Sequence, residues 1–157
     1  MQGTTPAFTL HSKEKFYEET DDILNGKTDK NYTFESLLNL YNAFKNVDAD
    51  MAYGSEYFTQ DEVNAEYAAL KSAFDSLQEG GDYSEYFEAY IKAQELISTN
   101  NTDSRGNALY DEEVFAEFVE TVTTTNDNLE KNLSATEENQ AKVDTATNTI
   151  KNAIATL

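Results

Sequence analysis

One stretch of the sequence has residue types and spacing close to those of a calcium-binding loop. In Asn101–Glu112, NTDSRGNALYDE, amide and carboxylate side chains fill the first and third positions, Gly106 the sixth, and Glu112 the twelfth. Arg105 occupies the fifth position, where a cation would oppose the metal ion. We therefore predict a polar loop with a glycine turn, followed by acids that cap the next helix, and assign no metal ligand.

Residues for catalysis are scarce. The only His is His11, which precedes the first expected helix and lies far in sequence from any candidate nucleophile, and there is no Cys. None of the 30 carboxylates lies in an apolar stretch that would raise its pKa for acid catalysis. The sequence also lacks a glycine-rich phosphate loop and a metal-binding spacing of His and Glu. We predict a protein that is not an enzyme and needs no cofactor.

Aromatic residues give the remaining candidates for a binding site, because the sequence has 10 Tyr and 9 Phe but no Trp. Tyr53, Tyr57 and Tyr83 fall in or near expected loops, where a ring could stack on a sugar or dock a protein. Rings in such loops also pack over the ends of helical bundles, so both roles stay open. Three more lie on expected core stripes, where packing is the predicted role: Tyr41, Tyr67 and Tyr90.

Charge limits the possible partners. With 30 acidic and 11 basic side chains the net charge is −19, which repels phosphate backbones and anionic lipids, so we expect no nucleic-acid partner. No run reaches the roughly 18 apolar residues of a membrane span, and we expect no membrane insertion. The start, MQGTTPAFTL, lacks the basic and apolar parts of a signal peptide. The absence of Cys leaves the compartment open.

The elements that must position these residues are helices, since the 157 residues include only 6 Gly and 1 Pro. After a flexible lead, 1–11, we predict a first unit, 12–79, of three helices. Ser12 caps the first, and Gly26 ends it. Thr33 caps the second, and a loop is expected after it in DADMAYGSEY, residues 48–57. The third opens with a capping box from Thr59 to Glu62 and a staple between Phe58 and Val63. The predicted inward positions of the second and third helices are Leu37, Leu40, Tyr41, Phe44, Val63, Tyr67, Leu70, Phe74 and Leu77.

The same pattern restarts after Gly80 and Gly81 and predicts a second three-helix unit, 82–157. Its first helix opens with a capping box from Asp82 to Glu85, and two more follow in YDEEVFAEFVETV and SATEENQAKVDTATNTIKNAIATL. Shifts of 73, 78 and 80 residues superpose the three helices in order, and the offsets grow only in loops. The matched pairs include Ile23 with Leu96, Leu40 with Phe118, Phe44 with Val122, Leu70 with Ile150, and Leu77 with Leu157. We predict an all-α chain of two tandem three-helix bundles, which form an elongated rod if the third helix runs nearly into the fourth.

The stretch YTFESLLNLYNAF, followed by TQDEVNAEYAALKSAFDSL, resembles the FIVAR module of Gram-positive cell-surface proteins. The second copy diverges: it keeps Tyr110 and Glu113 but loses the Thr and Ser of the motif, and Leu37 stands where the family usually has Trp. The resemblance implies a small three-helix bundle that recurs as an accessory module of large secreted or wall-attached proteins.

On these grounds we expect a non-catalytic spacer or presentation module. It would be located outside the cell, at the surface or wall, as a monomer within a larger multimodular chain. The alternative is an adhesion module that binds a cell-wall or host glycan or protein through exposed Tyr and acidic faces.

Overall fold

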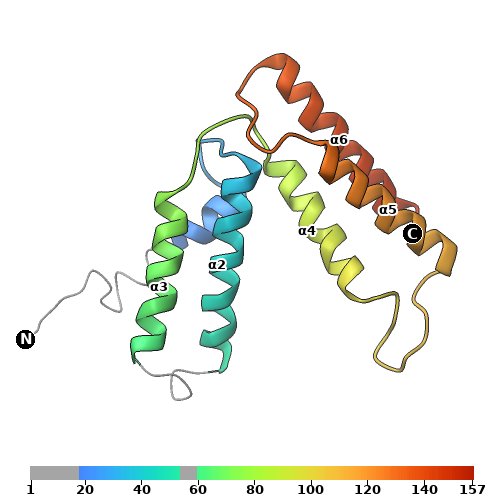
Figure 1. The fold of residues 1–157 in the computed structure, drawn as a ribbon, viewed down its shortest axis with the longest axis horizontal. Helices are drawn as coiled ribbons and strands as arrows, with labels where there is room; N and C mark the ends of the chain where they lie inside the picture. Colours follow the sequence, from blue (N-terminus) through green and yellow to red (C-terminus); the bar gives the residue numbers. More distant parts are fainter. Residues whose placement is uncertain (1–17, 54–59) are drawn as a thin grey trace, which may run out of the picture. The chain divides into compact units, whose positions relative to one another are not determined.

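The computed structural model describes residues 18–53 and 60–157 (Figure 1). For 48–53, Gln60 and Val63 it describes the backbone alone. In this part of the chain, helix is the only regular secondary structure, and the two β-bridges are isolated. The all-α prediction is therefore confirmed for the described residues. The chain divides into two compact units between Glu79 and Gly80.

The first unit is built around two long helices, α2 (Phe34–Tyr53) and α3 (Gln60–Asp75), which pack side by side (Figure 1). Residues 18–24 are also helical, and their Ile23 and Leu24 pack against the core that α2 and α3 enclose. The start predicted for this helix at Ser12 lies outside the described residues. The buried centre of the unit consists of Leu40, Val47, Tyr67 and Leu70.

Helix α2 is longer than the sequence predicted. A loop was expected from Asp48, but the helix continues to Tyr53. The extra residues include Ala and Met and contain no Gly or Pro before Gly54, so nothing in the chain breaks the helix earlier. The capping box and staple predicted for α3 include Phe58 and Thr59, which lie outside the described residues.

The start of α2 is fixed by buried hydroxyl groups, which agrees with the predicted cap. Thr33 Oγ1 accepts a hydrogen bond from the Ser36 N–H (3.4 Å) and donates one to Ser36 Oγ (2.9 Å). Ser36 Oγ also accepts from the Gln78 N–H at 3.2 Å, and the Thr33 N–H donates to the Gln78 carbonyl at 2.8 Å. The segment after α3 is thereby tied to the first turn of α2.

The second unit contains α4 (Ser84–Ser98), α5 (Glu112–Asn128) and α6 (Glu137–Ala155), and α6 packs against both of the others. Asp111 caps α5 by accepting from the N–H groups of Glu113 and Val114, and Thr136 caps α6. The fully buried side chains of this unit are Tyr83, Tyr86, Ala93, Val122, Val143 and Ile150.

The capping box predicted at Asp82 and Glu85 is wrong. Asp82 Oδ1 accepts from the N–H and the hydroxyl of Ser84, two residues on, and Tyr83 stands at the N-cap without a side-chain cap bond. The Asp82 side chain closes a local turn with Ser84 and makes no capping bond to Glu85. Helix α3 ends at Asp75 and α4 begins at Ser84, so the third and fourth helices are not continuous.

The junction before α4 is held by the second unit. The Gly81 N–H donates to the Leu133 carbonyl at 2.9 Å. The Gln140 amide pairs with the Asp82 backbone: Oε1 accepts from the Asp82 N–H and Nε2 donates to its carbonyl, both at 3.0 Å. The entry to α4 is therefore anchored to α6 and to the segment between α5 and α6, which contains Leu133.

The two units share their helical register. A shift of 78 residues places the start of α2, Phe34, on the start of α5, Glu112, and a shift of 80 places the end of α3, Asp75, on the end of α6, Ala155. Matched positions also share burial. The pairs in which both side chains are buried are Thr20 with Ala93, Leu40 with Phe118, Tyr67 with Thr147, and Leu70 with Ile150.

Candidate interaction groove on the second unit

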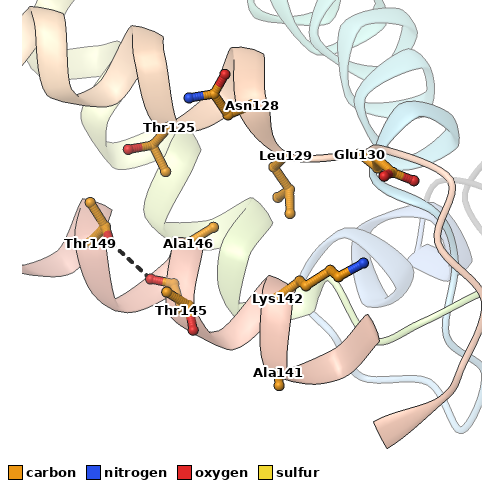
Figure 2. Close-up of a pocket in the computed structure, with 9 residues that line it drawn as sticks. All are labelled: Thr125, Asn128, Leu129, Glu130, Ala141, Lys142, Thr145, Ala146 and Thr149. Carbon is orange, nitrogen blue, oxygen red and sulfur yellow. Dashed lines mark hydrogen bonds between the residues drawn. The ribbon is translucent and has the colours of Figure 1, made fainter. Parts of the chain in front are cut away.

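A groove lies between the C-terminal half of α5 and the N-terminal half of α6 (Figure 2). Its volume is about 580 Å³. Leu129 lies at the end of α5, and its side chain points towards α6, where Thr149 Oγ1 donates to the Thr145 carbonyl at 2.9 Å. The lining side chains are Thr125, Asn128, Leu129, Glu130, Ala141, Lys142, Thr145, Ala146 and Thr149.

A second hollow of about 470 Å³ adjoins the first, since Thr149 lines both. It runs between the N-terminal half of α5 and the C-terminal half of α6, and its lining includes Val114, Glu117, Thr121 and Asn152. The two hollows together form one groove along the seam of α5 and α6, which we call the α5–α6 groove. On α6 it extends from Ala141 to Thr156, a length of about 22 Å at the helical rise.

Ala and Thr make up half of the residues that line the groove. One lining position is smaller than its match in the first unit: where that unit has Val47, 1% exposed, the second has the half-buried Thr125. Phe44 is replaced by Val122, and Tyr67 in α3 corresponds to Thr147 in α6, whose hydroxyl donates to the Val143 carbonyl four residues back. Val122 and Thr147 lie outside the lining of the groove.

The groove is mostly apolar in its floor and acidic at its edges. Thr methyl groups, Ala and Leu129 form the floor, while Glu117 and Glu130 line the walls. Lys142 is the one basic side chain in the lining. The nearby Lys131 Nζ donates to the Asn126 and Leu129 carbonyls, where it caps the end of α5.

Helix α5 adds to this acidic character, because its 17 residues include five acids and no base. Val114, 39% exposed, is a rare large apolar side chain on the surface of the described residues and lies in the groove wall. The groove therefore combines an apolar lining with an excess of acidic side chains in and beside it.

Of the sequence-predicted Tyr candidates, Tyr83 is the one whose side chain the structure describes, and it does not line this groove. Tyr83 is fully buried: its hydroxyl donates to the Glu130 carbonyl at 2.6 Å and accepts from the Leu133 N–H at 3.0 Å. Of the two roles left open for Tyr83, the structure shows packing, because the residue joins α4 to the segment between α5 and α6. The side chain of Tyr53 and the whole of Tyr57 lie outside the described residues.

Tyr83 belongs to a packed Tyr row on α4. Tyr86 and Tyr90 stack with ring centroids 6.2 Å apart, and the Tyr86 hydroxyl donates to Asn126 Oδ1 at 2.8 Å. Burial, the largest cause, raises the pKa of Tyr83, Tyr86 and Tyr90 above the ordinary value. Tyr67 of α3 is likewise buried, and its pKa is also raised by burial. The assignment of Tyr67 to packing is confirmed; Tyr41 and Tyr90 are half-buried.

The loop that resembled a calcium site uses its polar side chains internally. Asp103 Oδ1 accepts from the N–H groups of Arg105 (2.8 Å) and Asn107 (2.9 Å), and these bonds lower the pKa of the Asp103 carboxyl. Asn101 pairs through both its amide atoms with the Tyr110 backbone, and Gly106 adopts a positive φ of 83°. The loop is a turn held by its own carboxylate, and Asp111 after it caps α5.

Neither a metal-binding cluster nor a membrane-spanning helix occurs in the described part of the chain. Within residues 18–53 and 60–157, no group of three or more His, Cys, Asp or Glu side chains is placed to hold a metal ion. No helix in those ranges combines the length and apolar character needed to cross a bilayer. His11 lies outside the described residues.

The sequence did not predict the groove, because a short side chain on the apolar stripe of a helix is equally typical of a packed core position. The signal in the sequence is the recurrence of Ala and Thr at helical spacing on the lining faces of α5 and α6. A groove can be inferred from these residues only once the packing of α5 against α6 is known.

Comparisons with known proteins were made for the whole chain. No protein-family profile matches it, and no curated protein or solved structure is significantly similar to it.

Proposed function

We propose that this chain is a non-catalytic helical repeat module, made of two tandem three-helix bundles, that acts as a spacer or presentation element. The observation that carries the proposal is the shared register of the two units. The starts of α2 and α5 and the ends of α3 and α6 fall at matched positions, and four matched pairs are buried in both units. A unit that encloses its own core can be repeated along a chain to add length.

The local chemistry of the motif residues supports this role. Thr33 and Ser36, which carry the FIVAR-like motif, are buried and hydrogen-bonded to one another and to the segment after α3. Their hydrogen bonds fix the start of α2 and connect it to the segment that ends the first unit. The resemblance to FIVAR-type modules and the net charge of −19 further support a place outside the cell, at the surface or wall of a Gram-positive bacterium, as a monomer within a larger chain.

Small-angle scattering of the full chain in solution tests the spacer role. We expect a monomer with an elongated distance distribution, since a spacer gains length only if its units follow one another. A compact particle with the two units packed together would contradict the proposal. Localisation is tested separately, by extracting wall and cytoplasmic fractions of the source cells and probing them with an antibody against this chain.

A recognition role is the second candidate, and the α5–α6 groove is the observation that favours it. The groove offers an apolar floor and acidic walls on one face of the second unit. A glycan array and a pull-down from wall or host extracts test this role in general terms. The matched control is the variant Thr149→Trp, which fills the middle of the groove and would remove any signal that depends on it.

A further inference from the structure

We infer that the α5–α6 groove docks a cationic amphipathic helix of a protein partner. This inference deepens the recognition role proposed above and is independent of the spacer role. The first argument is shape: the two hollows meet at Thr149 and follow the helices for about 22 Å. A groove between two parallel ridges of side chains is the surface into which a further helix packs.

The floor of the groove fits the apolar face of such a helix. Alanine and threonine let a helix backbone approach closely, and of the larger apolar residues towards opposite ends of the lining, Leu129 is buried and Val114 is exposed. Val114 is 39% exposed, so docking would remove its apolar surface from water.

Charge decides the polar face of the partner. Glu117 and Glu130 line the groove, and exposed Glu113 and Glu120 lie one turn from Glu117 on α5. Helix α5 has no basic residue that could balance them. A partner helix with Lys or Arg at the borders of its apolar stripe would pair with these carboxylates, as complementary interfaces do.

The same features argue against two other occupants. A second copy of this chain would bring another net charge of −19 to an already acidic surface. A glycan would be expected to meet an exposed aromatic ring, but the one aromatic side chain in the lining, Phe118, is only 3% exposed.

The test measures binding of a dye-labelled peptide to the full chain by fluorescence anisotropy, at an ionic strength of about 0.15 M to screen diffuse attraction. The probe is a peptide of about 16 Leu and Lys residues, ordered so that Leu forms one helical face. A scrambled peptide of the same composition is the first control. We expect the ordered peptide to bind and the scrambled one to bind at least about tenfold more weakly.

Two matched pairs of variants locate the site. Thr149→Trp fills the groove and should weaken binding about tenfold or more, whereas Ala69→Trp, at the matched position of the first unit, should leave it unchanged. Lys142→Glu removes the one basic group of the lining and should tighten binding about two- to fivefold. Lys151→Glu makes the same change of charge away from the groove and should have no comparable effect.

The outcomes are decisive in either direction. Absence of binding to the wild-type chain overturns the inference, as does an equal effect of Thr149→Trp and Ala69→Trp, which would indicate attraction by net charge alone. If circular dichroism shows that Thr149→Trp loses helix, the Lys142 and Lys151 pair decides. Capture of a glycan that Thr149→Trp abolishes, without peptide binding, would replace the helix with a sugar ligand. None of these results bears on the scattering test of the spacer role.

Discussion

At the position where α2 carries Phe44, the matched position of α5 carries Val122, and Tyr67 of α3 is matched by Thr147 of α6. The first unit therefore places aromatic rings at these two positions, while the second places shorter side chains there. The second unit instead buries Tyr83 and Tyr86 on and beside α4. The comparison teaches that helical register and side-chain volume vary separately, because the same pattern of helices is kept with different side chains at its matched positions.

The largest expected effect comes from the matched pair Leu70 and Ile150, both fully buried. Leu70→Ala and Ile150→Ala should each lower the free energy of unfolding of their own unit by about 2–5 kcal/mol, through lost burial and a new cavity. Chemical denaturation with hydrogen exchange resolved along the sequence measures this. Loss of protection in both units from either variant would show that the units unfold together.

The next effect probes the buried Tyr that is particular to the second unit. Tyr83→Phe leaves the Leu133 N–H and the Glu130 carbonyl without their hydroxyl partner, and should cost about 1–3 kcal/mol. Tyr86→Phe, which loses the bond to Asn126, serves as the control and should cost less. Thermal unfolding followed by circular dichroism measures both. Equal stability of Tyr83→Phe and the wild type would indicate that water replaces the hydroxyl.

The two matched caps, Thr33 of α2 and Asp111 of α5, should differ in cost. Substitution of a capping side chain by Ala costs about 0.5–2 kcal/mol. Thr33→Ala should fall at the upper end, because Thr33 is buried and also bonded to Ser36, whereas Asp111 is exposed. Urea denaturation of the two variants measures the difference. A greater loss for Asp111→Ala would show that helix dipole and charge outweigh the buried network.

The smallest effect concerns the longer loop of the second unit. Its hydrogen bonds hold the Asp103 pKa below the ordinary value, so the stability they give is present above pH of about 4 and is lost as the pH falls through the lowered pKa. The amide signals of Arg105 and Asn107 in nuclear magnetic resonance spectra should shift in that acidic range. Asp103→Asn should abolish the shift, and its persistence in the variant would assign it to another group.

Much of the fold could be predicted because it follows from local signals. Thr33 begins α2 as its side chain and the apolar stripe after it indicate, and Leu40 is buried as its spacing predicts. The end of α2 was misplaced, because Asp48 and Asp50 suggested a loop although no residue there breaks a helix.

The candidate site was harder to predict, because it depends on what two helices leave between them. Tyr83 looked like a loop residue by its neighbours in sequence, but its burial is set by Glu130 and Leu133, about 50 positions further along the chain. The volume beside Thr149 likewise depends on side chains from both α5 and α6.

The hydrogen bonds made by the backbone of Gly81 and Asp82 have a mechanical consequence. If the chain is stretched, tension enters the second unit at these two residues, whose backbone is bonded to Leu133 and to the Gln140 amide. The load then passes to α6 through Gln140 and to the segment before α6 through Leu133, so these few bonds bear the tension before α4 does.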